Sequence, residues 1–309
     1  MPASDKLEIT PKNLSEVSEP QCPQIRPEAH SGEILPAQAS VEPSPACAGP
    51  GCAPPAYVYA LGRIEPRYPS PSVEKEFAQV TGRADTTGLT DRQALQSILS
   101  KRENRYLMRQ LCWVLTIEGI ETYLLKPRNP SDHDLLVDAV RPTPRATDVD
   151  VIIGVRGPIA PPQMCNGLAV PIVLFDQTYS FDVDSLLKSI PKPEKMTPKA
   201  FTPVAEEVFT RIQQLADNAG ATDEHRALNY LAIRYPAVYT IAAEQYGRNC
   251  SLGGVEVLPS RLSGVRNIVS VVFSFTNRQT DVVEKYFVRV DVTEEFPFLV
   301  TKMSPYHDR

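Results

Sequence analysis

The amino-acid sequence changes character abruptly at residue 57. Residues 1–56 contain 11 of the 30 prolines, seven acidic and three basic residues, and no aromatic residue. A segment of this composition buries too little apolar surface to offset the entropy that it loses on ordering. We therefore expect residues 1–56 to form a disordered, proline-rich acidic tail. The fold should begin at Tyr57, where aromatic and aliphatic residues first cluster.

Charge and hydrophobicity exclude several classes of protein. The formal net charge of -5 and the absence of a Lys/Arg block argue against nucleic-acid binding, which needs a basic face. The chain opens without the apolar segment of a signal peptide, and no apolar run approaches 18 residues, so we expect neither export nor a membrane span. These features predict a cytoplasmic protein, in which the six cysteines would be reduced thiols.

Residues 57–190 alternate helical and strand patterns, which predicts the α/β part of a larger domain. Helical spacing of apolar residues appears at 72–80 and again after Thr90. Residues 110–117 and 122–125 predict a β-hairpin, and 148–155 and 170–175 predict two further strands. Within the hairpin, Leu111, Trp113 and Leu115 alternate onto one face, so we expect Trp113 to be buried in a strand covered on both sides.

The second half of the sequence begins after a proline-rich linker at 191–203. Residues 204–309 then contain three helical patterns, the second of them capped by Thr222, followed by β-rich runs at 255–258, 268–275, 286–292 and 298–302. The fold class predicted for the whole is α+β: a mixed N-terminal sheet with helices, then three helices packed on an antiparallel β-meander.

One pair of residues offers the elements of a cysteine-dependent enzyme. Cys165 lies in an irregular loop, and His225 lies near the start of a predicted helix. A thiol nucleophile needs a histidine to lower its pKa, so Cys165 and His225 are the candidate catalytic dyad. The alternative is a buried structural cysteine and a surface histidine.

Several acidic, cysteine and histidine residues have the spacing of ligands. Cys22, His30, Cys47 and Cys52 are the ligand types of a zinc site, although only one short pair is present, so free thiols in a linker remain the alternative. Paired carboxylates at i and i+2 share a strand face and could hold a cation; their simpler interpretation is an exposed edge strand or helix caps. These pairs are Asp148 with Asp150 and Asp182 with Asp184. Asp132-His133-Asp134 fits a turn before a helix.

The irregular segment 157–167 is the predicted binding surface. Its three prolines fix the backbone and remove amide donors, so the loop is ordered in advance at low entropic cost. Arg156, Met164 and Asn166 combine apolar and polar groups there, a mixture expected at a peptide groove. The alternative is a rigid crossover that only packs over the sheet.

Several stretches together resemble a known family. The sequence from Tyr57 to Arg67 is similar to the start of the C-terminal domain of unknown function in PatG-type cyanobactin maturation proteins, a domain related to the end of PatA-type proteins. The other similar stretches are residues 103–106, 110–115, 148–151, 154–161, 164–167, 218–230 and 273–277. The resemblance covers roughly residues 57–309. The family's subtilisin-like protease is absent from this sequence, so the resemblance implies a pathway and transfers no catalytic residue.

Three functions follow as hypotheses. The first is a stand-alone accessory protein, without a cofactor, that binds a precursor peptide or a maturation enzyme of a ribosomally synthesised, modified peptide. The second is a small cysteine-dependent hydrolase or transferase acting on such peptides. The third is a structural module that forms homo-oligomers through exposed strand edges.

Overall fold

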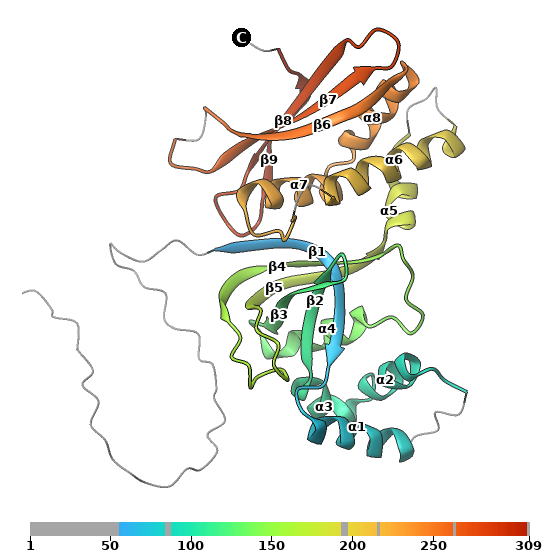
Figure 1. The fold of residues 1–309 in the computed structure, drawn as a ribbon, viewed down its shortest axis with the longest axis vertical. Coiled ribbons are helices and arrows are strands. Elements are labelled where there is room, and N and C mark those ends of the chain that lie inside the picture. The colour runs from blue at the N-terminus through green and yellow to red at the C-terminus, as the bar shows by residue number, and fades with distance from the viewer. Residues whose placement is uncertain (1–55, 84–87, 193–196, 215–216, 262–263, 308–309) are drawn as a thin grey trace, which may run out of the picture. The chain divides into compact units, whose positions relative to one another are not determined.

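The first strand, β1 (Tyr57–Arg67), starts where the composition changes. The computed structural model in Figure 1 describes residues 56–83, 88–192, 197–214, 217–261 and 264–307. The tail predicted at residues 1–56 therefore lies, apart from Ala56, outside the described residues. No helix within the described ranges is both long enough and apolar enough to cross a membrane.

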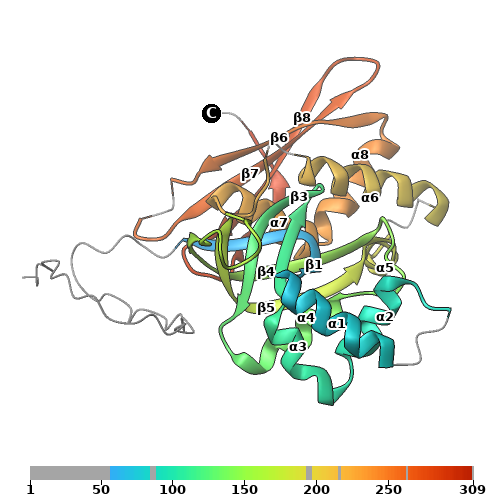
Figure 2. The same ribbon diagram turned by 60° about the horizontal axis from the view of Figure 1, so that its bottom comes forward.

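Five strands of the first half close into a barrel in the order β1-β2-β3-β5-β4. The barrel is mixed because β3 and β5 run parallel, whereas the other neighbouring strands run antiparallel. Figures 1 and 2 show the first three α-helices of this half gathered at one end of the strands, whereas its last helix lies beside the first helix of the second half. After β1 the elements are α1 (Pro71–Arg83), α2 (Asp91–Leu99), η1 (Arg102–Asn104), α3 (Arg105–Gln110), β2 (Cys112–Ile117), β3 (Ile120–Pro127), η2 (Pro130–Asp132), α4 (His133–Ala139), β4 (Asp148–Ile159), β5 (Pro171–Asp182) and α5 (Val183–Ser189).

The second half consists of three helices and a four-stranded antiparallel sheet in the order β6-β7-β8-β9. Its elements are α6 (Pro198–Gln213), α7 (Asp223–Arg234), α8 (Ala237–Gly247), β6 (Cys250–Pro259), β7 (Ile268–Asn277), β8 (Val283–Asp291) and β9 (Phe298–Pro305). The α+β class, the mixed first sheet and the helical layer on a β-meander are confirmed. Thr222 also caps α7 as predicted, accepting a hydrogen bond from the His225 amide at 3.2 Å.

Several predicted boundaries differ from the structure, and two of these differences concern the proline-rich segments. β4 continues through Gly157 and Pro158 to Ile159, so the irregular loop begins at Ala160. α6 begins at Pro198, which makes the end of the proline-rich segment at 191–203 helical. Proline suits the first position of a helix because that amide would lack an intrahelical partner anyway.

The buried residues divide into three clusters that follow the alternation of the barrel strands. Val58 and Ala60 of β1 face the barrel interior and the helices at its end, whereas Tyr59 and Leu61 face α7 and the second half. A third, small cluster lies on the outer face of β2, β3 and β5, beneath the loop between β4 and β5. Both faces of these strands are therefore covered, by different parts of the chain.

A polar seam joins β1 to the connection between α6 and α7. The Tyr59 amide donates to the Gly220 carbonyl at 2.9 Å, and the Tyr59 carbonyl accepts from Asn229 Nδ2 at 2.8 Å. The Asn218 and Asn229 side-chain amides exchange hydrogen bonds of 2.8 and 3.1 Å, and both residues are buried. Through these contacts the seam completes the hydrogen bonding of β1 at a residue that β2 does not reach.

Trp113 lies in β2 as predicted and is 2% exposed. It packs with Leu111 and Leu115 inside the barrel, while Cys112 and Val114 face the outer cluster. The indole Nε1 donates to the Met108 carbonyl at 2.9 Å. The predicted alternation, with both faces of the strand covered, is confirmed.

We expect Trp113→Ala to lower the free energy of unfolding by about 3–5 kcal/mol, because it leaves a cavity in the barrel interior. Trp113 is the only tryptophan, so urea unfolding of the variant should be followed by far-UV circular dichroism. Trp113→Phe should cost less because it keeps most of the ring volume. An unchanged unfolding midpoint for Trp113→Ala would contradict the packing described.

The seam predicts a specific role for Gly220, whose φ is +70°. A Cβ at this position would lie 2.3 Å from the Tyr59 carbonyl oxygen and 2.6 Å from Ala60 Cα. Gly119 is a matched control, because its φ is +82° and a Cβ added there would have no neighbour within 4 Å. We expect Gly119→Ala to cost about 1 kcal/mol and Gly220→Ala at least about 2 kcal/mol more in unfolding free energy. Equal losses of unfolding free energy in the two variants would mean that the close approach of Gly220 to β1 does not contribute to stability.

Candidate binding cleft beside a disulfide

The loop between β4 and β5 is a compact turn whose hydrogen bonds close on itself. The Ala160 amide donates to Val170 O at 2.8 Å, and the Gly167 amide donates to Pro162 O at 2.8 Å. Asn166 and Gly167 both have positive φ angles, 48° and 89°, which asparagine and glycine tolerate better than other residues. The turn is therefore held in shape by its own backbone and prolines, as the sequence predicts.

A disulfide between Cys112 and Cys165 fastens this loop to β2, with a separation of 53 residues in sequence. The expectation that all cysteines are reduced thiols is wrong for these two. Both residues are buried in the small outer cluster with Val114, Leu124 and others. Among the described residues Cys250 is a free, buried cysteine.

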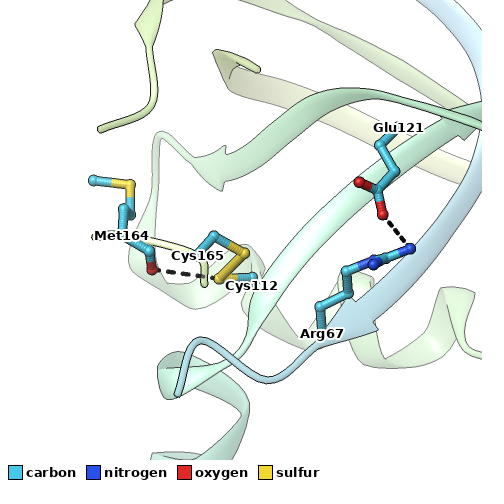
Figure 3. Close-up of a disulfide and its surroundings, with 5 residues drawn as sticks. All are labelled: Arg67, Cys112, Glu121, Met164 and Cys165. Atoms are coloured by element: carbon cyan, nitrogen blue, oxygen red, sulfur yellow. Dashed lines mark hydrogen bonds and ion pairs between the residues drawn. A yellow bond between two sulfur atoms is a disulfide. The ribbon is translucent and has the colours of Figure 1, made fainter. Parts of the chain in front are cut away.

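A cleft of about 580 Å³ opens beside the disulfide. One wall is the corner where β1 leads into α1, from Pro66 to Pro71 with Glu74, and the other is the turn from Cys165 to Leu168. Glu121 of β3 also lines the cleft and forms an ion pair with Arg67, as Figure 3 shows. The cleft thus combines a proline-rich and aromatic corner with a rigid polar turn, and its size suits a short peptide segment.

The cleft has a net negative lining. Arg67 is the one cation among its described lining residues, and it is paired with Glu121, which leaves Glu74 as the excess charge. Burial, and then the charges of Glu74 and Asp91, raise the pKa of the Tyr68 hydroxyl. Tyr68 is 36% exposed and packs edge-on against Phe77. The lining therefore favours a ligand with a positive charge and an apolar part.

The structure places the three predicted binding residues in different surroundings. Asn166 is exposed and lines the cleft. Met164 is on the same turn, but its side chain packs partly against the small outer cluster. Arg156 is exposed on β4 and is not among the residues lining the cleft. Burial raises the pKa of the Tyr123 hydroxyl, and the charge of Arg156 opposes this shift. Sequence reasoning missed Arg67, Tyr68 and Glu74, which lie about 90 residues before the turn in sequence.

The candidate catalytic dyad lacks a nucleophile in this structure. The Cys165 sulfur is bonded to Cys112, so it is not a thiolate. His225 lies partly buried in the first turn of α7, where its amide is bound by the Thr222 cap.

The carboxylates of Asp148 and Asp150 share a strand face, as their spacing predicts, but their surroundings differ from the expected exposed edge. Both are buried, because β4 lies between β1 and β5 in the closed barrel. Asp150 Oδ2 accepts from the Ile64 amide at 2.7 Å, and Arg141 Nη1 lies 3.4 Å from Asp148. Burial raises the pKa of Asp150, although hydrogen bonds from Ser180 and Ile64 oppose this. Asp150 thus completes the hydrogen bonding of β1 where that strand leaves β4, whereas Asp148 accepts from the Arg145 amide at 2.7 Å.

Other predicted ligands also have structural surroundings. Asp182 occupies the N-cap position of α5, where it accepts from Ser185 Oγ at 3.2 Å, and Asp184 lies in the first helical turn. His133 begins α4 after the short helix η2, so the predicted turn before a helix is confirmed. Within the described ranges no three His, Cys, Asp or Glu residues gather as a metal site. Cys22, His30, Cys47 and Cys52 lie outside those ranges.

A second charged cluster, which sequence reasoning missed, lies where the β8–β9 connection meets the barrel. Arg226 of α7 is 3% exposed and donates to the carbonyls of Val292 and Glu294. Asp176 of β5 forms an ion pair with Arg128 at 2.9 Å. Burial, followed by the hydrogen bond and charge of Asp176, raises the pKa of Glu295 to about 7, against the opposing charges of Arg128 and Arg226.

Comparison with known proteins identifies relatives of this fold. A family model described as "PatG Domain" matches residues 57–248, and one described as "PatG C-terminal" matches residues 195–306. A solved structure described as "PatG Domain of Unknown Function" is similar with a TM-score of 0.66 and 19% sequence identity, covering 81% of this chain and 98% of that one. At this identity the likeness concerns the fold alone. No curated protein matches significantly.

The raised pKa of Glu295 predicts that stability falls as pH rises. The folded state binds the proton of the Glu295 carboxyl more tightly than the unfolded chain does. Protonation of Glu295 therefore stabilises the fold fully below the usual pKa of 4.5, and this contribution is lost as pH rises through about 7. Glu295→Gln should therefore flatten the decrease in melting temperature between about pH 5 and about pH 8. Glu294→Gln, on the same connection, should keep the wild-type slope. A slope unchanged by Glu295→Gln would contradict the raised pKa of Glu295.

Proposed function

Because the chain belongs to the PatG Domain family, we propose that it is a binding module of peptide maturation that holds a peptide segment in the cleft beside the disulfide. The role in maturing a cyanobactin-like, ribosomally synthesised peptide follows from the family. The precursor peptide is the expected ligand, and a maturation enzyme is the other partner that this role allows.

The cleft carries the proposal. Its walls come from segments that the barrel fixes independently: the β1–α1 corner through the strand ladder, and the 165–168 turn through a disulfide. Walls that are fixed before binding reduce the entropy lost when a flexible peptide is ordered. Exposed polar groups of Asn166 and Glu74 can fix the orientation of a backbone, while Tyr68 and the prolines offer apolar contact.

Exposed sheet edges are the feature that the oligomerisation hypothesis requires. β6 and β9 are the two edges of the second sheet. β9 carries an exposed Lys302 and ends at Pro305, and both residue types discourage pairing between edges. The cleft therefore offers a better supported binding surface than the strand edges do.

The test is calorimetric titration of the full chain with precursor peptides encoded beside it. We expect Asn166→Gly, which removes the side-chain amide and tolerates the positive φ angle, combined with Glu74→Gln, to weaken binding at least about tenfold, or about 1.4 kcal/mol, with a nearly unchanged melting temperature. Arg156→Ala is the matched control, since this exposed residue lies outside the cleft. Loss of binding through Arg156→Ala alone would place the ligand elsewhere on the barrel, and no binding of any precursor peptide would remove the proposal.

A further inference from the structure

The two sulfur atoms of the disulfide are placed differently with respect to the cleft. Cys165 belongs to the turn that lines the cleft, whereas Cys112 belongs to β2 and is not part of the lining. Figure 3 shows the bond joining this turn to the strand, with Met164 beside it. A thiolate that enters from the cleft therefore meets Cys165 first, and Cys112 is the sulfur that leaves.

A hydrogen-bond acceptor already lies beside the leaving sulfur. The Met164 carbonyl oxygen is 3.5 Å from Cys112 Sγ. Once Cys112 is released and protonated, its S–H can donate to this carbonyl, so the reduced state has a partner for its new donor.

The wall of the cleft can also yield when the bond breaks. The Met164 and Gly167 amides donate to carbonyls of Pro161 and Pro162, and the Leu168 amide donates to Cys165 O, all within the turn. Besides the disulfide and the contact between the Met164 carbonyl and Cys112 Sγ, the turn packs against β2 and β3 through the small outer cluster. Cys165 is only 3% exposed, so an attacking thiolate needs this turn to move.

We propose that the Cys112–Cys165 disulfide is a thiol-exchange site that opens on the cleft and reacts with a cysteine-containing peptide carrying a basic residue. The inference rests on the proposed function, since the cleft must hold the peptide before exchange. The peptide thiolate forms a bond to Cys165 Sγ, the Cys112–Cys165 bond breaks, and its electron pair goes to Cys112 Sγ, which takes a proton from water. No external oxidant or reductant is consumed.

The charge of the lining determines the class of peptide. Glu74, the excess negative charge of the lining, disfavours a thiolate with acidic neighbours, because like charges raise its pKa and repel it. A lysine or arginine next to the cysteine pairs with Glu74 and also lowers the pKa of the attacking thiol. The site therefore selects a basic cysteine peptide over an acidic one.

The experiment treats the oxidised full chain with acetyl-Lys-Cys-Lys-amide or acetyl-Glu-Cys-Glu-amide at equal thiolate concentration. Free thiols are then alkylated, and Cys112 and Cys165 are located by mass spectrometric peptide mapping. We expect the mixed disulfide on Cys165, an alkylated thiol at Cys112, and exchange about tenfold faster with the basic peptide. Glu74→Gln should reduce that preference, whereas Glu256→Gln, an exposed carboxyl on β6, should leave it unchanged.

Adducts divided equally between the two cysteines, adducts mainly on Cys112, or exchange that occurs only in denaturant would overturn the proposal. The serine peptide acetyl-Lys-Ser-Lys-amide separates its failure from that of the proposed function. If precursor peptides bind in competition with the serine peptide and no exchange occurs, the exchange site alone is refuted. If neither precursor nor serine peptide binds, the proposed function fails as well.

Discussion

The fold depends on the hydrogen-bond partners of the Tyr59 backbone amide and carbonyl. β1 pairs with β4 along Tyr57–Gly62 and with β2 only from Arg63, so one side of its first half lacks a strand partner. Gly220 and Asn229 supply the missing acceptor and donor from the second half of the chain. A buried unpaired amide or carbonyl would destabilise the barrel by about 1–3 kcal/mol. Together with the apolar cluster that the barrel shares with the second half, the seam joins the two halves in one compact unit.

Since the second half of the chain packs on the outer face of β1 and β4, the outer face of β2, β3 and β5 must be covered by other means. The loop between β4 and β5 covers it, and the disulfide fastens that loop where the apolar cluster is small. The candidate cleft follows from this arrangement, because a short loop covers the strands without filling the space beside the β1–α1 corner. The candidate cleft and the closure of the barrel thus have a common origin.

Local features could be predicted from the sequence, and features that join distant segments could not. The burial of Trp113, the Thr222 cap and the meander each depend on neighbouring residues. The parallel pairing of β3 with β5 and the disulfide join segments about 50 residues apart, which leave no periodic pattern. In the cleft, the prolines and glycines around Asn166 are enough to predict its turn. The wall formed by the β1–α1 corner could not be predicted, because only the closed barrel brings that corner close to the turn.

The most direct test of the seam uses Trp113 as a reporter for the barrel. Asn229 lies in α7 of the second half, and its loss leaves the Tyr59 carbonyl without its side-chain donor. Urea unfolding of Asn229→Ala should be followed both by Trp113 fluorescence and by far-UV circular dichroism. We predict one transition, with both midpoints lowered together by the equivalent of about 1–3 kcal/mol. An unmoved fluorescence midpoint, with a separate earlier transition in circular dichroism, would show that the barrel folds without the seam.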